Sequence, residues 1–224
     1  MYSLLKECIF IYRFQKLIHI EIDVHGIDVI ARKVYFDLWG EEVTENNKYK
    51  LTMLKYILNN IGLYYDYRYR HDIICYLVKA LELRKIIPSK NLLSHCGARE
   101  YAPAKNGQNI LKHGVSFNEF IDGGSHDFGL NSIGGLPENR ILTFATLDND
   151  CDLKNKAFGF CISESHNSKL RIISARKFTI NNYKSVINSA VKGNKEENRN
   201  LERKMWELMR EIAKEHAIGM IVKI

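Results

Sequence analysis

Between Ala104 and Ala175 the sequence passes from two helix patterns to four strand patterns. Ala104–Lys112 is a helix pattern that Gly114 can end, and Ser116 with Glu119 forms a capping box that can start a second helix. The strand candidates, which are rich in β-branched and aromatic residues, are Asp127–Ile133, Arg140–Leu147, Ala157–Ser163 and Leu170–Ala175. Helices followed by a strand meander predict an α+β domain with helices packed on an antiparallel sheet.

The N-terminal part carries a different mixture of patterns. Three partly alternating runs predict a small antiparallel sheet: Ile9–Phe14, Ile18–Val24 and Ile27–Phe36. Apolar residues at helical spacing then predict two helices, around 51–61 and 73–81, before a linker at 87–97. We therefore expect a mixed sheet-and-helix domain at 1–97, an α+β domain at 98–190, and an amphipathic helix with a tail at 191–224.

Charge and hydropathy narrow the class of protein. The 224 residues include 33 Lys and Arg against 26 Asp and Glu, a formal net charge of +7. The longest apolar run, Cys8–Tyr12, is far shorter than the roughly 18–20 residues of a membrane-spanning helix. Lys6, Glu7 and Arg13 interrupt any secretory signal, and the five cysteines contain no C-x-x-C pair. We expect a cytoplasmic protein with reduced thiols and no membrane association.

Positive charge is concentrated late in the chain. From Ser165 to Lys195 there are seven basic residues and no Asp or Glu: Lys169, Arg171, Arg176, Lys177, Lys184, Lys192 and Lys195. A stretch of one sign attracts polyanions. Strand alternation in Leu170–Ala175 predicts that Arg171 shares a face with Ile173 and Ala175, and that Arg176 follows at the end of the strand.

Three residue types in this region suit phosphate chemistry. Arg171 and Arg176 offer planar donors that can bind a phosphate and stabilise its transition state. His113 follows Lys112 at a helix end, where the carbonyl dipoles favour a protonated imidazole that can act as a general acid. Glu164 can accept a proton from a ribose 2′-hydroxyl. The plainer alternatives are salt-bridged strand arginines, a surface histidine and a loop glutamate.

The sequence contains no clear motif for binding a metal or a nucleotide cofactor. His71 and Cys75 are four residues apart, but no repeated zinc-ligand spacing occurs, and ordinary packing is the favoured interpretation. The paired glycines at 123–124 and 134–135 lack the contexts of phosphate-binding loops. We therefore expect neither a metal nor a nucleotide cofactor. Aromatic residues around Arg68 and Arg70 can stack on bases or pack in a core.

Three blocks, in order, resemble the BrnT family of bacterial type II toxins. They are Glu100–Lys105, with an acidic-aromatic step and a lysine; Asn109–Phe117, followed by Glu119; and Leu170–Lys177. The similarity extends from about Arg99 to Asn188, and residues 1–98 precede it. Tyr101 stands where relatives carry a tryptophan-like residue, Ser165 where an arginine often follows the glutamate, and the loop at 148–155 is longer than usual.

The resemblance implies a RelE-like fold, metal-independent ribonuclease activity that arrests translation, and a neutralising antitoxin encoded alongside. Carried over by motif, the residues are Lys112, His113, Glu164, Arg171, Ser174 and Arg176. We infer that His113, Glu164, Arg171 and Arg176 are catalytic and that Lys112, Ser174 and Lys177 bind the RNA substrate. Our inference is that His113 and Glu164 transfer protons while the two arginines stabilise the phosphate. Attack by the 2′-oxygen then leaves a cyclic phosphate and a 5′-hydroxyl.

Two other functions are compatible with the same sequence. The basic residues of 170–177 suit a non-catalytic module that binds nucleic acid through its phosphate backbone, with strongly salt-dependent affinity. A nuclease effector acting on DNA or on a modified nucleotide is the third interpretation. Cleavage assays with RNA and DNA in the presence of a chelator distinguish the three.

Overall fold

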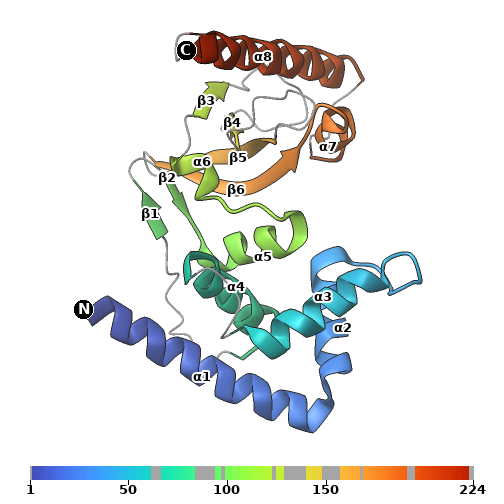
Figure 1. The fold of residues 1–224 in the computed structure, drawn as a ribbon. Coiled ribbons are helices and arrows are strands. Elements are labelled where there is room, and N and C mark those ends of the chain that lie inside the picture. Colours follow the sequence, from blue (N-terminus) through green and yellow to red (C-terminus); the bar gives the residue numbers. More distant parts are fainter. Residues whose placement is uncertain are drawn as a thin grey trace. The chain divides into compact units, whose positions relative to one another are not determined.

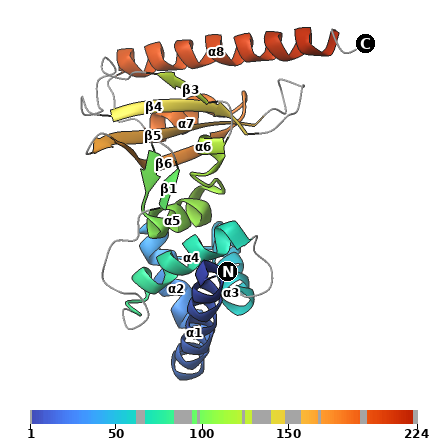
Figure 2. The same ribbon diagram turned by 90° about the vertical axis from the view of Figure 1, so that its left-hand side faces the viewer.

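The structure, a computed structural model, is an α+β protein with two compact units (Figures 1 and 2). It describes residues 2–61, 67–83, 94–96, 99–122, 125–128, 140–147, 157–166, 169–190 and 195–221. Unit 1 comprises Met1–Ser94 and Tyr101–Ser116, and unit 2 comprises His95–Glu100 and Phe117–Ile224. This division differs from the expected ranges, because residues 101–116 belong with the N-terminal helices and residues 195–221 belong with the sheet.

Unit 1 is helical throughout its longer described segments. Its helices are α1 (Tyr2–His25), α2 (Ile27–Trp39), α3 (Lys48–Asn60), α4 (Tyr67–Ala80) and α5 (Pro103–His113). They enclose one apolar core, to which every helix of the unit contributes side chains. The helices expected around 51–61 and 73–81 are confirmed as α3 and α4. The sheet expected at 9–36 is wrong, because these residues form α1 and α2.

The reason for this difference lies in the spacing of the buried side chains of α1. Phe14 and Ile18 are fully buried, and Phe10 and Ile22 pack against the same core. Steps of four residues place all four side chains on one face of a helix. The preference of β-branched and aromatic residues for strands is weak enough to be overridden by such packing. Gly26 adopts a φ of 78° at the junction between α1 and α2.

Helices α4 and α5 approach each other closely at Gly107. A Cβ atom at this position would lie 1.9 Å from the Asp72 carbonyl oxygen, so only glycine fits. The adjacent Asn106 is fully buried and donates from Nδ2 to Asp72 Oδ2 at 2.7 Å and to Ser116 Oγ at 3.1 Å. Close packing and buried hydrogen bonds together hold α5 against α4.

Unit 2 is built on a six-stranded sheet with the order β1-β2-β6-β5-β4-β3. Its strands are β1 (Ser94–Cys96), β2 (Arg99–Tyr101), β3 (Ser125–Phe128), β4 (Arg140–Thr146), β5 (Phe158–His166) and β6 (Lys169–Phe178). β2 is parallel to β6, whereas β3 to β6 form an antiparallel meander. The last three predicted strands are confirmed. Of the first, only Asp127 and Phe128 lie within the described residues.

The two faces of this sheet carry side chains of different size. One face presents large apolar residues, including Phe144, Phe158, Phe160 and Phe178, to α7 (Tyr183–Ala190) and α8 (Lys195–Ile221). Helix α8 contributes the buried residues Leu201, Met205 and Met209 and runs alongside β3 in Figures 1 and 2. The amphipathic helix expected at 191–224 is confirmed as α8, which extends to Ile221.

The opposite face carries small residues that leave room for α6 (Glu119–Asp122) and the turn before it. Thr143, Cys161, Ser163 and Ala175 are buried there. At Gly159, an added Cβ would lie 2.6 Å from Phe120 Cζ. Arg99 also donates to the Phe120 carbonyl oxygen at 2.9 Å. The large-residue face is therefore packed by α7 and α8, and the small-residue face by aromatic side chains.

Candidate functional site

A β-bulge in β6 determines which side chains share a face of the sheet. Arg171 pairs with Glu164 and Arg176 pairs with Phe160, and the register shifts between Ile162 and Ser163. Paired residues of an antiparallel ladder point to the same side, and alternate residues of a strand share a face. Glu164 and Phe160 are four residues apart on β5, so they share a face. Arg171 and Arg176 therefore lie on that same face, which is the face whose large apolar residues pack against α7 and α8, and both arginine side chains remain partly exposed there.

Without the bulge, a spacing of five residues would place the two arginines on opposite faces. The bulge adds one residue to β6, and this extra residue restores the shared facing. Ala175 pairs with Cys161 and is buried on the other face, so the expectation that it shares a face with Arg171 is wrong. β6 continues to Phe178, which places Arg176 inside the strand rather than at its end.

Four charged residues form a row across neighbouring strands. Their register order is Arg140 on β4, Glu164 on β5, Arg171 on β6 and Glu100 on β2. We call this set the charged row. Its signs alternate, so each charged side chain has neighbours of opposite charge at cross-strand distance, roughly 4.5–5.5 Å between Cβ atoms of an antiparallel pair. Three of the four are partly exposed, whereas the Glu100 side chain is 6% exposed.

Arg171 is held firmly at one end of the charged row. Its Nε and Nη2 donate to Glu100 Oε1 at 2.9 and 2.7 Å. The Arg171 side chain remains 32% exposed. The ion pair therefore links β2 to β6 and leaves Arg171 partly accessible to an anion.

Arg176 has a different environment from Arg171. It is half-buried, and its Nη1 donates to Ser174 Oγ at 3.1 Å and to the Ala175 carbonyl oxygen at 3.2 Å. Burial lowers the pKa of the Arg176 guanidinium. Within the described part of the chain, no carboxylate forms an ion pair with it. A half-buried cation without a counter-charge favours an anionic ligand.

Lys112 and His113 lie in the last turn of α5, as the sequence predicts. Gly114 ends the helix with a φ of 67°, and its N–H donates to the Ile110 carbonyl oxygen at 2.8 Å. Lys112 is exposed and His113 is half-buried. Both residues belong to unit 1, whereas Glu164, Arg171, Ser174 and Arg176 belong to unit 2. The structure gathers the second group on one face of one sheet.

Lys177 was expected to bind the substrate, whereas Glu100 and Arg140 were not expected at the site. Lys177 is exposed and pairs with Gly159, so it points to the face opposite Arg176. Glu100 and Arg140 were not expected in the charged row. Glu100 is part of the acidic-aromatic motif that starts the BrnT-like region, which is the one signal that marks it in the sequence. The Nε atom of Arg140 is buried and lacks a hydrogen-bond partner among the described residues.

His71 and Cys75, the closest approach to a metal-binding pair in the sequence, belong to a packed cluster on α4. Cys75 Sγ lies 3.9 and 3.7 Å from the two ring nitrogens of His71, and His71 Nδ1 lies 3.0 Å from Asp72 Oδ1. A thiol almost equidistant from both nitrogens sits beside the ring rather than in line with one nitrogen. Within the described residues, no group of three or more metal-ligating side chains occurs.

Comparison of the chain with family models, curated proteins and solved structures found no match. None of the helices in the part of the chain that the structure describes has the length and hydropathy to cross a membrane.

Proposed function

We propose that this chain is a metal-independent ribonuclease related to the BrnT toxins. Its RNA site lies on the face of the unit 2 sheet that carries Arg171 and Arg176. The observation that carries the proposal is the bulge in β6, which puts Glu164, Arg171, Ser174 and Arg176 on one face. A carboxylate beside two guanidinium groups provides a proton acceptor and phosphate donors within one surface.

The order of elements supports a RelE-like fold for this region. From β2 to α7 the chain forms a strand, the helices α5 and α6, the meander of β3 to β6, and a final helix. These elements span the same part of the chain as the BrnT resemblance, about Arg99 to Asn188. The strands β3 to β6 are antiparallel, β2 is parallel to β6, and α6, α7 and α8 pack on the sheet, which supports a RelE-like domain.

The proposed reaction assigns one role to each side chain. Glu164 removes the proton of a ribose 2′-hydroxyl, and the 2′-oxygen attacks the adjacent phosphorus. The phosphorus–5′-oxygen bond breaks, the 5′-oxygen takes up a proton, and a 2′,3′-cyclic phosphate remains. Arg176 and Arg171 stabilise the negative charge that develops on the phosphate oxygens, and Ser174 orients Arg176. The roles expected of Lys112 and His113 in unit 1 stay predictions.

The Arg171–Glu100 ion pair favours a second candidate function. A guanidinium whose Nε and Nη2 both contact one carboxylate has fewer donors left for a scissile phosphate. The same surface then suits a non-catalytic module that binds the nucleic-acid backbone through Arg176 and neighbouring basic residues. Both functions use the same binding face. Only the ribonuclease requires Glu164, because binding without cleavage needs no proton acceptor.

Induction of the full chain in bacteria tests the proposal. We expect the wild type to arrest growth and fragment total RNA, and Glu164→Gln and Arg176→Ala to abolish both effects. Lys204→Ala is the matched control, since Lys204 is an exposed cation on α8 outside the proposed site. Growth arrest with intact RNA favours the binding module. Equal RNA fragmentation by wild type and both variants contradicts the proposed site.

A further inference from the structure

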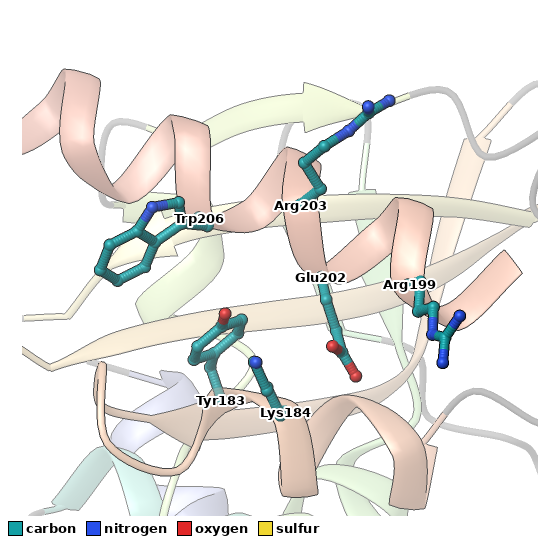
Figure 3. Close-up of a pocket in the computed structure, with 6 residues that line it drawn as sticks. All are labelled: Tyr183, Lys184, Arg199, Glu202, Arg203 and Trp206. Carbon is teal, nitrogen blue, oxygen red and sulfur yellow. The ribbon is translucent and has the colours of Figure 1, made fainter. Parts of the chain in front are cut away.

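A pocket of about 560 Å³ lies between α7 and α8, and none of its lining residues is assigned to cleavage. Its lining consists of two aromatic, three basic and one acidic residue: Tyr183, Lys184, Arg199, Glu202, Arg203 and Trp206 (Figure 3). The volume falls within the roughly 300–1,000 Å³ typical of small-ligand pockets. All six residues belong to unit 2.

The aromatic wall is formed by one ring from each helix. The rings of Tyr183 and Trp206 have centroids 6.2 Å apart and planes inclined by 23°. Both side chains are half-buried and pack against the core between the helices and the sheet. In Figure 3, Trp206 faces Tyr183 across the space between the helices. Near-parallel aromatic rings of this kind form a platform on which a nucleobase can stack.

The charged lining favours an anionic ligand. Lys184, Arg199 and Arg203 face one acidic residue, Glu202, which leaves a net charge of +2. Among the described residues, no carboxylate forms an ion pair with any of these three cations. Lys184 Nζ lies 5.9 Å from the centre of the Tyr183 ring. In Figure 3, Arg199 and Glu202 point to the same side of α8, whereas Arg203 points away from Tyr183. Lys184 and Arg199 are therefore the better placed cations.

Glu202 is oriented by a short hydrogen-bond chain between the helices. Asn198 Nδ2 donates to Asn188 Oδ1 at 2.9 Å, and Asn188 Nδ2 donates to Glu202 Oε1 at 3.1 Å. Asn198 Oδ1 is buried and lacks a donor within the described residues. The second oxygen of Glu202 remains able to accept a hydrogen bond from a ligand.

We propose that this pocket binds a nucleotide, with its base stacked against Trp206 and Tyr183 and its phosphate held by Lys184 and Arg199. Glu202 accepts an N–H from an exocyclic amino group, so cytosine is preferred over uracil. The bound unit is either a free nucleotide or one nucleotide of a single strand. This inference goes beyond cleavage and does not depend on it, because it assigns a separate contact in unit 2.

Trp206 fluorescence tests the proposal directly in the full chain. Trp39 is the other tryptophan, so a Trp39→Phe background isolates the Trp206 signal. The ligands are cytidine monophosphate and a ten-residue 2′-O-methyl oligocytidine, which resists attack by a 2′-oxygen. We expect saturable quenching and, for the oligonucleotide, roughly sevenfold weaker binding between 50 and 200 mM salt if two cations contact phosphate.

Variants and ligands separate the outcomes. Lys184→Ala and Arg199→Ala should each weaken binding about fivefold, while Lys204→Ala, an exposed lysine on α8 outside the lining, should leave it unchanged. Glu202→Gln should reduce the preference for oligocytidine over oligouridine. Saturation by the monophosphate identifies a free-nucleotide site, and response to the oligonucleotide alone identifies a strand-binding site. No change in Trp206 fluorescence with either ligand, in a chain that unfolds cooperatively, overturns the proposal.

Discussion

Arg171 and Arg176 point to the same face of the sheet although they lie five positions apart on β6. The bulge opposite Ile162 and Ser163 supplies the extra residue that makes this possible. Glu164 occupies the same face through its pairing with Arg171. One local irregularity therefore brings a carboxylate and two guanidinium groups to one surface, and the proposed RNA site depends on it.

Arg176 and Lys177 point to opposite faces of the sheet, so we expect them to contribute unequally to RNA binding. Arg176→Ala should weaken binding of a single-stranded RNA about tenfold, because it removes a half-buried cation that no carboxylate of the described residues neutralises. Lys177→Ala removes the same charge from the opposite face and should change affinity less than about threefold. Fluorescence anisotropy at fixed salt measures both. Equal losses would show that the shared face does not determine binding.

The Arg171–Glu100 ion pair should stabilise unit 2. Glu100→Gln removes the buried carboxylate that accepts from Arg171 Nε and Nη2, and we expect a loss of about 2 kcal/mol in the free energy of unfolding. Adding Arg171→Met should recover part of this loss, because the charge that the Glu100 carboxylate balanced is then removed as well. Urea unfolding measures the change.

An exposed ion pair provides the control for this prediction. Lys48 Nζ lies 2.5 Å from Glu45 Oε2, and the Glu45 side chain is 86% exposed. Glu45→Gln should cost less than about 1 kcal/mol. Equal effects of Glu100→Gln and Glu45→Gln would indicate that the buried pair contributes no special stability.

At Gly107, the sign of the stability change on substitution by alanine tests the close contact between α4 and α5. Replacing a glycine inside a helix with alanine ordinarily stabilises a protein by about 1 kcal/mol. Gly107→Ala should instead destabilise it by about 3 kcal/mol, since the new Cβ would lie 1.9 Å from the backbone oxygen of Asp72. Thermal unfolding monitored by circular dichroism distinguishes the two signs. A stabilised variant would contradict the close contact between α4 and α5.

His71 should make unit 1 less stable at alkaline pH. The hydrogen bond with Asp72, helped by Cys75, raises the pKa of His71 to about 10, from roughly 6.5 in an unfolded chain. Because the folded-state pKa is the higher one, this stabilisation is complete below about pH 6.5 and is lost as the pH rises towards 10. Urea unfolding at pH 6, 8 and 10 should show the decline, and His71→Gln should flatten it. An unchanged slope in the variant would refute this assignment.

The sequence predicted the regular parts of the structure better than its irregular ones. The strands after 140 and the helix ending at Gly114 follow from alternation and capping, which are local properties. The N-terminal sheet was wrong because the side chains of Phe14 and Ile18 are buried by tertiary contacts that local β-propensity does not include. No sequence pattern reveals the bulge near Ile173 or the partner of Glu100, because both depend on how distant strands align.

Cleavage of a defined RNA by the purified full chain in EDTA tests the central claim most directly. The substrate pair is a single-stranded RNA and the same oligonucleotide with 2′-deoxy nucleotides throughout. We expect the wild type to cut only the RNA and to leave 2′,3′-cyclic phosphate ends, and Glu164→Gln to lose at least about a hundredfold in rate. Intact RNA, cleavage of the deoxy strand, or full activity of Glu164→Gln would contradict the proposed ribonuclease.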